Sequence, residues 1–178
     1  MTDFEALGYR TGELNLPGLD VIVQLGPDQY FRDDGIVSDL GAHAQSIYHQ
    51  LCGFSYQGEI PPAYGIHLPT NIGEKKFSTI FIRDIDPITN LLVLGHEVTH
   101  ALKFLSLEHY LIQALRAERF SIDPFKKYDN EETIADIGGL LALHKVNKIH
   151  HVKDPRLNHL LLDSRFGPLV DDLLSSYQ

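Results

Sequence analysis

Apolar side chains recur every three or four residues in two stretches of the chain, and this spacing predicts an amphipathic helix in each. The first helix is expected over residues 38–52 and is stopped by Gly53. The second is expected over residues 87–105, with Asp86 as its cap and Pro87 at its first position. The apolar positions are Leu40, Ala44, Ile47 and Leu51 in the first helix, and Leu91, Leu94, Val98, Leu102 and Leu105 in the second.

Two short runs rich in β-branched and aromatic residues predict strands. They cover residues 19–25 and 77–83, and a shorter strand is expected over residues 64–68. The strand over 77–83 is expected either to lie in the core or to bind an extended substrate along its edge. Gly and Pro mark turns in residues 1–20 and 53–76, and the second of these segments is expected to form a lid.

The second half of the chain is expected to be helical. Helices are predicted over residues 107–120 and from Asn130 towards residue 150, and one or two more are predicted after Pro155. No internal repeat, low-complexity segment or linker divides the sequence, so residues 1–178 are expected to form one domain.

Residues 94–102 read Leu-Gly-His-Glu-Val-Thr-His-Ala-Leu and contain the pattern His-Glu-x-x-His within a predicted helix. Residues four apart lie one above the other on a helix, so the imidazoles of His96 and His100 can reach one ion. Glu97 is rotated by about 100° from His96, which places its carboxylate beside the ion, where it can accept a proton from bound water. Zinc-dependent peptidases use this arrangement.

A catalytic zinc site usually has three protein ligands, so a third ligand is expected further along the chain. Glu132 is the best candidate, because Asp136 follows it four residues later on the same helical face. A carboxylate at that position can accept a hydrogen bond from His96 or His100 and fix the orientation of the ring. Glu131 competes with Glu132 for the role of third ligand, and the spacing to Asp136 favours Glu132.

The pattern His96-Glu97-x-x-His100 followed by Glu132-x-x-x-Asp136 resembles the signature of the gluzincin metallopeptidases, of the thermolysin and neprilysin kind. Residues 135–139, Ala-Asp-Ile-Gly-Gly, are similar to the glutamate helix of the neprilysin type. The resemblance covers roughly residues 38–150 and implies an α+β fold with a zincin-like metallopeptidase core. This core has a small mixed sheet, a backing helix, an active-site helix and a glutamate helix, and C-terminal helices would follow it. The ImmA/IrrE-type regulatory proteases are a close second, because their second helix also carries Glu followed by Ala and Asn or Asp.

The resemblance implies a role for each residue of the two motifs. His96, His100 and Glu132 would bind one Zn²⁺ ion. Glu97 would act as general base and then as general acid, and Asp136 would orient a histidine. Zinc lowers the pKa of bound water to about 7, which makes hydroxide available at neutral pH to attack a peptide carbonyl.

A side chain that stabilises the oxyanion is also expected, usually His, Tyr or Arg. His144 and Tyr128 are the first candidates, and Tyr110, His150 and His151 are also available. Nothing in the sequence selects one of them, and a structural role is the alternative for His144. The remaining histidines have no partner pattern and are expected to be structural: His43, His49, His67, His109 and His159.

Composition and charge are those of a soluble globular protein, with 43% hydrophobic and 22% charged residues. The formal net charge of -9 argues against a nucleic-acid partner, because binding nucleic acid needs concentrated Lys and Arg. No apolar run is long enough to span a membrane, and the sequence after Met1 lacks the features of a signal peptide. Cys52 is the single cysteine, which excludes an intrachain disulfide and favours a reducing compartment. A cytoplasmic location is therefore expected if Met1 is the natural start.

The expected function is zinc-dependent hydrolysis of a peptide or protein substrate. Two other functions are left open: a zinc-containing regulatory module that acts by binding a partner protein, and a zinc hydrolase of a non-peptide amide. The presence of Glu97 weighs against the regulatory module, because a protein that only binds has no use for that carboxylate.

Overall fold

The structure is a computed structural model that describes residues 10–16, 19–27, 64–84, 86–147, 149, 158 and 162–178. The chain divides into two compact units, Met1–Val93 and Leu94–Gln178. The boundary falls inside the helix that carries the His-Glu-x-x-His pattern, and the prediction of a single domain stays a prediction. The helix predicted over residues 38–52 lies outside the described residues, and so does Cys52.

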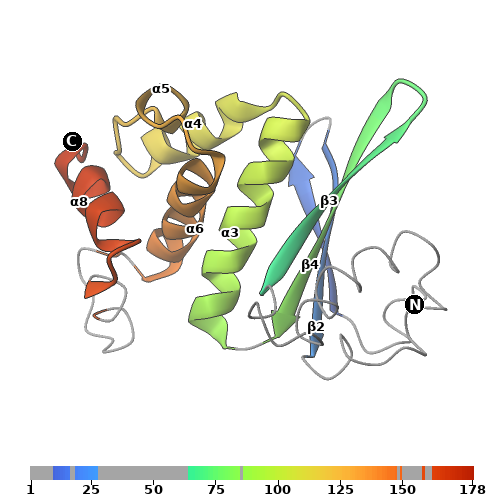
Figure 1. The fold of residues 1–178 in the computed structure, drawn as a ribbon, viewed down its shortest axis with the longest axis horizontal. Helices are drawn as coiled ribbons and strands as arrows, with labels where there is room; N and C mark the ends of the chain where they lie inside the picture. Colours follow the sequence, from blue (N-terminus) through green and yellow to red (C-terminus); the bar gives the residue numbers. More distant parts are fainter. Residues whose placement is uncertain are drawn as a thin grey trace. The chain divides into compact units, whose positions relative to one another are not determined.

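Four strands form one mixed sheet in the first unit (Figure 1). They are β1 (Arg10–Leu16), β2 (Leu19–Pro27), β3 (Gly65–Ile72) and β4 (Lys75–Asp84). Their order across the sheet is β1-β2-β4-β3, in which β2 and β4 are parallel and the other two pairs are antiparallel. The strands predicted over residues 19–25 and 77–83 are thus confirmed as β2 and β4.

Two strands differ from the sequence predictions. β1 was not predicted, because Gly12 lies within it. This segment forms a strand by pairing with β2, and Leu16 of β1 stands opposite Leu19 of β2. β3 is longer than predicted and pairs with β4 from Gly65 to Ile72. In the turn between β3 and β4, Gly73 has a φ of 62°, which glycine adopts without strain. Residues 65–76 of the predicted lid therefore form a hairpin, and residues 53–63 lie outside the described residues.

β4 is an inner strand of the sheet. Ile80 stands opposite Val23 of β2 on one side and opposite His67 of β3 on the other. The backbone of β4 is therefore hydrogen-bonded to two neighbours, and the alternative that it binds a substrate along its edge is wrong. Its Ser78 and Ile80 side chains are buried, and Ser78 Oγ lies 2.9 Å from His67 Nε2.

The helix α3 (Pro87–Phe104) begins as the sequence predicts. Asp86 Oδ1 accepts hydrogen bonds from the backbone N–H groups of Ile88, at 3.0 Å, and Thr89, at 3.1 Å. Its Oδ2 accepts a hydrogen bond from the Thr89 hydroxyl at 2.7 Å. Pro87 occupies the first helical position, where no backbone donor is needed. The cap and the proline together fix the start of the helix nine residues before His96.

Four further helices are described in the second unit: α4 (Glu108–Ala117), α5 (Pro124–Lys127), α6 (Glu131–Asn147) and α8 (Gly167–Ser175). α4 is shorter than the predicted helix over residues 107–120, and α5 was not predicted. α6 confirms the helix predicted from Asn130, whose side chain accepts hydrogen bonds from the backbone N–H groups of Glu132 and Thr133. α8 lies in the stretch after Pro155 in which C-terminal helices are predicted.

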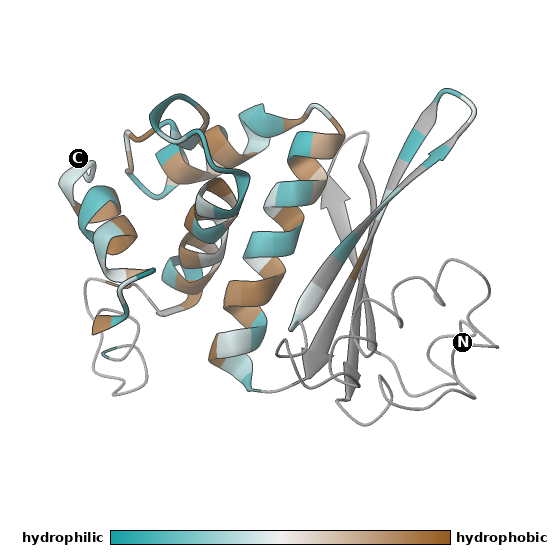
Figure 2. Ribbon diagram, in the orientation of Figure 1, coloured by the Kyte–Doolittle hydropathy of each residue, from teal (hydrophilic) through white to brown (hydrophobic). Residues whose placement is uncertain are grey.

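Apolar side chains from these helices form the core of the second unit. Figure 2 shows apolar and polar residues on different sides of α4 and α8, and α6 is buried continuously from residue 134 to residue 141. No helix within the described ranges is both long and apolar enough to cross a membrane. The largest buried side chains include Phe120, Leu115, Ile137, Leu140, Leu143 and Leu173.

Candidate metal centre

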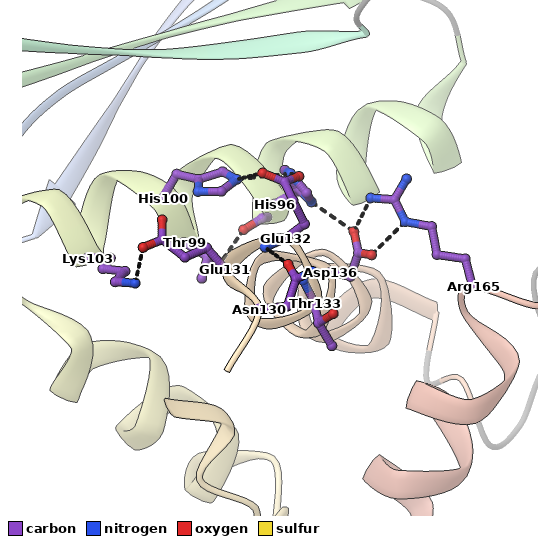
Figure 3. Close-up of polar contacts among 11 residues, drawn as sticks. His96, Thr99, His100, Lys103, Asn130, Glu131, Glu132, Thr133, Asp136 and Arg165 are labelled. Carbon is purple, nitrogen blue, oxygen red and sulfur yellow. Dashed lines mark hydrogen bonds and ion pairs between the residues drawn. The ribbon is translucent and has the colours of Figure 1, made fainter. Parts of the chain in front are cut away.

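Three side chains from two helices converge in the second unit (Figure 3). His96 and His100 lie one turn apart on α3, and their Nε2 atoms are 3.1 Å apart. Glu132 extends from the first turn of α6, with Oε2 at 3.2 Å from His96 Nε2 and Oε1 at 3.4 Å from His100 Nε2. The sequence prediction that these three residues meet agrees with this arrangement.

The spacing of these three donors fits a tetrahedral metal ion. Ligands about 2.0–2.1 Å from a tetrahedral zinc ion stand about 3.3 Å from one another. The three donor separations, 3.1, 3.2 and 3.4 Å, agree with this value. The side chains of His96 and His100 are 16% and 20% exposed and that of Glu132 is 65% exposed, so the group is accessible from the Glu132 side. Among the described residues, this is the His, Cys, Asp or Glu group whose geometry suits an ion.

Asp136 supports one of the two histidines. Its Oδ1 lies 2.9 Å from His96 Nδ1, so this ring nitrogen is occupied and Nε2 is directed towards Glu132. Asp136 lies one helical turn after Glu132 on α6, and its side chain is buried. A carboxylate in this position fixes the tautomer and the orientation of a metal-binding imidazole.

Arg165 binds the same carboxylate and has no counterpart in the sequence predictions. Its Nε donates to Asp136 Oδ2 and its Nη2 to Asp136 Oδ1, both at 2.6 Å. Burial raises the pKa of Asp136, but the hydrogen bonds with His96 and Arg165 lower it by more, so it lies below its usual value. Asp136 is therefore held as a carboxylate between an imidazole and a guanidinium group (Figure 3).

The surroundings shift the pKa values of the two histidines in opposite directions. Burial lowers the pKa of His96, but the hydrogen bond with Asp136 and the nearby carboxylates raise it by more. Burial and the neighbouring His96 lower the pKa of His100 below its usual value. A metal ion binds neutral imidazole, so a proton on His96 would compete with an ion and weaken its binding as the pH falls.

Glu97 follows His96 on α3, and its side chain is buried, with 8% exposure. The negative charge of Glu97 is among the influences that raise the pKa of His96. A buried carboxylate that follows His96 directly in the sequence is a candidate proton acceptor for chemistry at this group.

The structure separates the two adjacent glutamates at the start of α6. Glu132 faces His96 and His100, whereas Glu131 Oε1 accepts a hydrogen bond from Lys103 Nζ (Figure 3). This hydrogen bond and the charge of Lys103 lower the pKa of Glu131. Of the two glutamates left open by the sequence, Glu132 is the one that joins the histidines.

A close crossing of α3 and α6 sets the distance between the histidines and the carboxylates. A Cβ atom on Gly95 would lie 2.4 Å from the carbonyl oxygen of Gly138. A Cβ atom on Gly138 would lie 1.8 Å from Thr99 Oγ1 and 2.7 Å from the carbonyl oxygen of Gly95. Gly95 precedes His96, and Gly138 follows Asp136 by two residues. The two glycines therefore allow the backbones to approach where the donors meet.

Replacing Gly138 by Ala is expected to destabilise the second unit by about 1–3 kcal/mol, as overpacking of a close contact does. The same change at an open helical position would stabilise by roughly 0.5–1 kcal/mol, so the sign of the effect identifies the crossing. Thermal or denaturant unfolding measures the change. Thr99→Ala removes the nearest atom and should reduce the cost of Gly138→Ala; equal costs in the two backgrounds would contradict the described crossing.

His144 lies far from the pair formed by His96 and His100. It lies twelve residues after Glu132 on α6, which is about 18 Å along the helix axis. Its ring is 1% exposed, packs edge-on against Phe120 at a centroid distance of 4.8 Å, and accepts a hydrogen bond from the backbone N–H of Ile149. The prediction of an oxyanion role for His144 is therefore replaced by a structural role in the core.

The hydroxyl of Tyr128 is hydrogen-bonded to a residue of α8. Its hydroxyl donates to Asp172 Oδ2 of α8, and burial together with this contact raises its pKa. Tyr128 thus joins the end of α5 to α8, and its predicted oxyanion role stays a prediction. The Tyr110 ring packs against His109 at a centroid distance of 4.2 Å. Five histidines considered in the sequence lie outside the described residues: His43, His49, His150, His151 and His159.

Comparison of the chain with protein-family profiles, curated proteins and solved structures gave no match. The function proposed below is therefore argued from the geometry of the described residues, the chemistry of their donor atoms and the resemblance of the two motifs to gluzincins.

Proposed function

We propose that this chain is a zinc-dependent metallopeptidase of the gluzincin type, in which His96, His100 and Glu132 bind one Zn²⁺ ion. The observation that carries the proposal is the triangle of donor atoms with sides of 3.1, 3.2 and 3.4 Å. The resemblance of the two motifs to gluzincins adds the reaction class. The zincin-like core is part of the proposal, with α3 as the active-site helix, α6 as the glutamate helix and β1–β4 as the small sheet.

The donor set favours zinc over Ca²⁺ and Mg²⁺. Ca²⁺ and Mg²⁺ prefer oxygen ligands throughout, whereas two imidazoles and one carboxylate suit a borderline ion such as Zn²⁺. Three protein ligands leave a fourth position for water or substrate, which is typical of catalytic and not of structural zinc. The Glu132 side chain is 65% exposed, so this side of the group is open to solvent.

The proposed reaction needs a Lewis acid, a proton acceptor and a fixed metal ligand. Bound zinc supplies a Lewis acid that lowers the pKa of water to about 7. Glu97 accepts the proton of the attacking water and later gives it to the leaving amine, so its carboxylate serves first as base and then as acid. Asp136, held by Arg165, keeps the His96 ring in one tautomer throughout.

The experiment that tests this function combines zinc loading with an unbiased search for cleavage. The purified chain is loaded with one equivalent of Zn²⁺ and incubated with a mixture of unfolded proteins, and mass spectrometry detects new peptide termini. We expect termini that disappear with a chelator and return when zinc is restored. Zinc binding without any new termini would reject the peptidase and favour the regulatory module or the non-peptide amide hydrolase.

A further inference from the structure

Two adjacent glutamates at the start of α6 could each supply the carboxylate ligand of the metal centre. Glu131 and Glu132 have the same side chain and adjacent positions, and both are exposed. Asn130 Oδ1 accepts hydrogen bonds from the backbone N–H of Glu132, at 2.8 Å, and of Thr133, at 3.4 Å, which fixes the first helical turn. From this turn the two carboxylates reach different partners on α3.

Lys103 lies where it can bind Glu131 and keep its carboxylate away from the histidines. His96, His100 and Lys103 are separated by four and three residues on α3, so they follow one stripe of the helix. Lys103 Nζ donates to Glu131 Oε1 across the gap between α3 and α6, one turn beyond His100 (Figure 3). Each glutamate therefore has its own partner on α3: Lys103 for Glu131, and the histidine pair for Glu132.

We propose that Lys103 is a positioning residue of the metal centre, which holds Glu131 away and leaves Glu132 as the carboxylate donor to His96 and His100. The inference rests on the proposed metal site and goes beyond it, because it assigns a role to a residue outside the two motifs. An ordinary surface ion pair is the alternative, since the Lys103 and Glu131 side chains are 39% and 57% exposed. Such a pair contributes little and would leave the choice of donor unchanged.

The test is a set of variants in the Glu132→Ala background, with the dissociation constant for Zn²⁺ measured by competition with a chromophoric chelator. If Lys103 restrains Glu131, then Lys103→Met releases a substitute donor. Zinc should then bind about tenfold more tightly than to Glu132→Ala alone, the low end of the effects of residues that position ligands. Lys103→Arg keeps the cation and serves as the matched control, which should give no gain.

A second comparison separates donor choice from simple charge. Removing a cation near a metal site favours a divalent ion whatever Glu131 does, so Lys103→Met is also measured with Glu131→Ala in the same background. The proposal expects the tenfold gain to vanish when Glu131 is absent. No gain with Glu131 present, or an equal gain without it, would overturn the proposal.

The same titrations keep this inference distinct from the proposed function. They need no peptidase assay, and wild-type chain with Glu132 intact reports whether the site binds zinc at all. Absence of zinc binding by the wild type would reject the metal site itself, and with it the role of Lys103. Zinc binding by the wild type with no dependence on Lys103 would reject only the positioning role.

Discussion

Replacing Glu132 by Ala is expected to lower the affinity for Zn²⁺ at least about 100-fold, beyond the 10- to 100-fold losses of residues that only orient ligands. The change removes one of three donors and leaves two imidazoles, which hold an ion in fewer directions. Because the Glu132 side chain is exposed and on the first turn of α6, the fold should tolerate the change. Competition with a chromophoric chelator measures the dissociation constant.

The neighbouring glutamate supplies a matched control for this experiment. Glu131→Ala removes an equal charge one residue away, from a carboxylate that contacts Lys103. We expect its zinc affinity to stay within about fivefold of the wild type, the scale of an exposed ion pair. A large loss with Glu131→Ala and a small one with Glu132→Ala would show that the third ligand is wrongly assigned.

Replacing Glu97 by Gln is expected to leave zinc binding nearly unchanged and to lower turnover by about 10²–10⁴-fold, the usual contribution of a positioned general base. Glutamine has the shape of glutamate but cannot take up the proton of the attacking water. The substitution sits next to His96 and is buried, so metal content and thermal unfolding are measured beside the rate. The rate itself is followed on a peptide identified in the mixture digest.

The outcome is informative only when zinc is retained. A variant that keeps one zinc ion, unfolds at the wild-type temperature and has lost its turnover would support Glu97 as the proton acceptor. Full turnover by such a variant would remove Glu97 from the reaction and leave the metal site standing.

Features set by neighbouring residues could be predicted from the sequence. Asp86 and Pro87 fix the start of α3 through contacts that reach only three residues along the chain. Asn130 does the same for α6. The four-residue spacings of His96 with His100 and of Glu132 with Asp136 place each pair on one face of its helix. The histidine pair and the carboxylate pair contact each other in the structure, as the two motifs predict.

Features set by distant residues could not be predicted. Arg165 reaches Asp136 from 29 residues away, and only the general need of a buried carboxylate for a cation hints at such a partner. The Gly95–Gly138 crossing and the Lys103–Glu131 pair also join separate helices. Each depends on how α3 and α6 pack, and periodicity within one helix contains no information about that.

Two incorrect predictions have clear physical causes. His144 was considered because it shares a general side of α6 with Asp136, but helical periodicity gives direction and not distance along the axis. Substrate binding along the edge of β4 was one of two alternatives, suggested by the fold that the resemblance implies, whereas the place of β4 in the sheet depends on β2 and β3. Strand order is a property of the whole sheet and is invisible in one strand.

The most direct measurement is diffraction at the zinc absorption edge from crystals of the zinc-loaded chain. The proposed centre predicts one anomalous peak about 2.0–2.2 Å from His96 Nε2, His100 Nε2 and a Glu132 carboxylate oxygen. A peak bound by other residues, or none at this position in crystals that contain zinc, would contradict the centre and the peptidase function built on it.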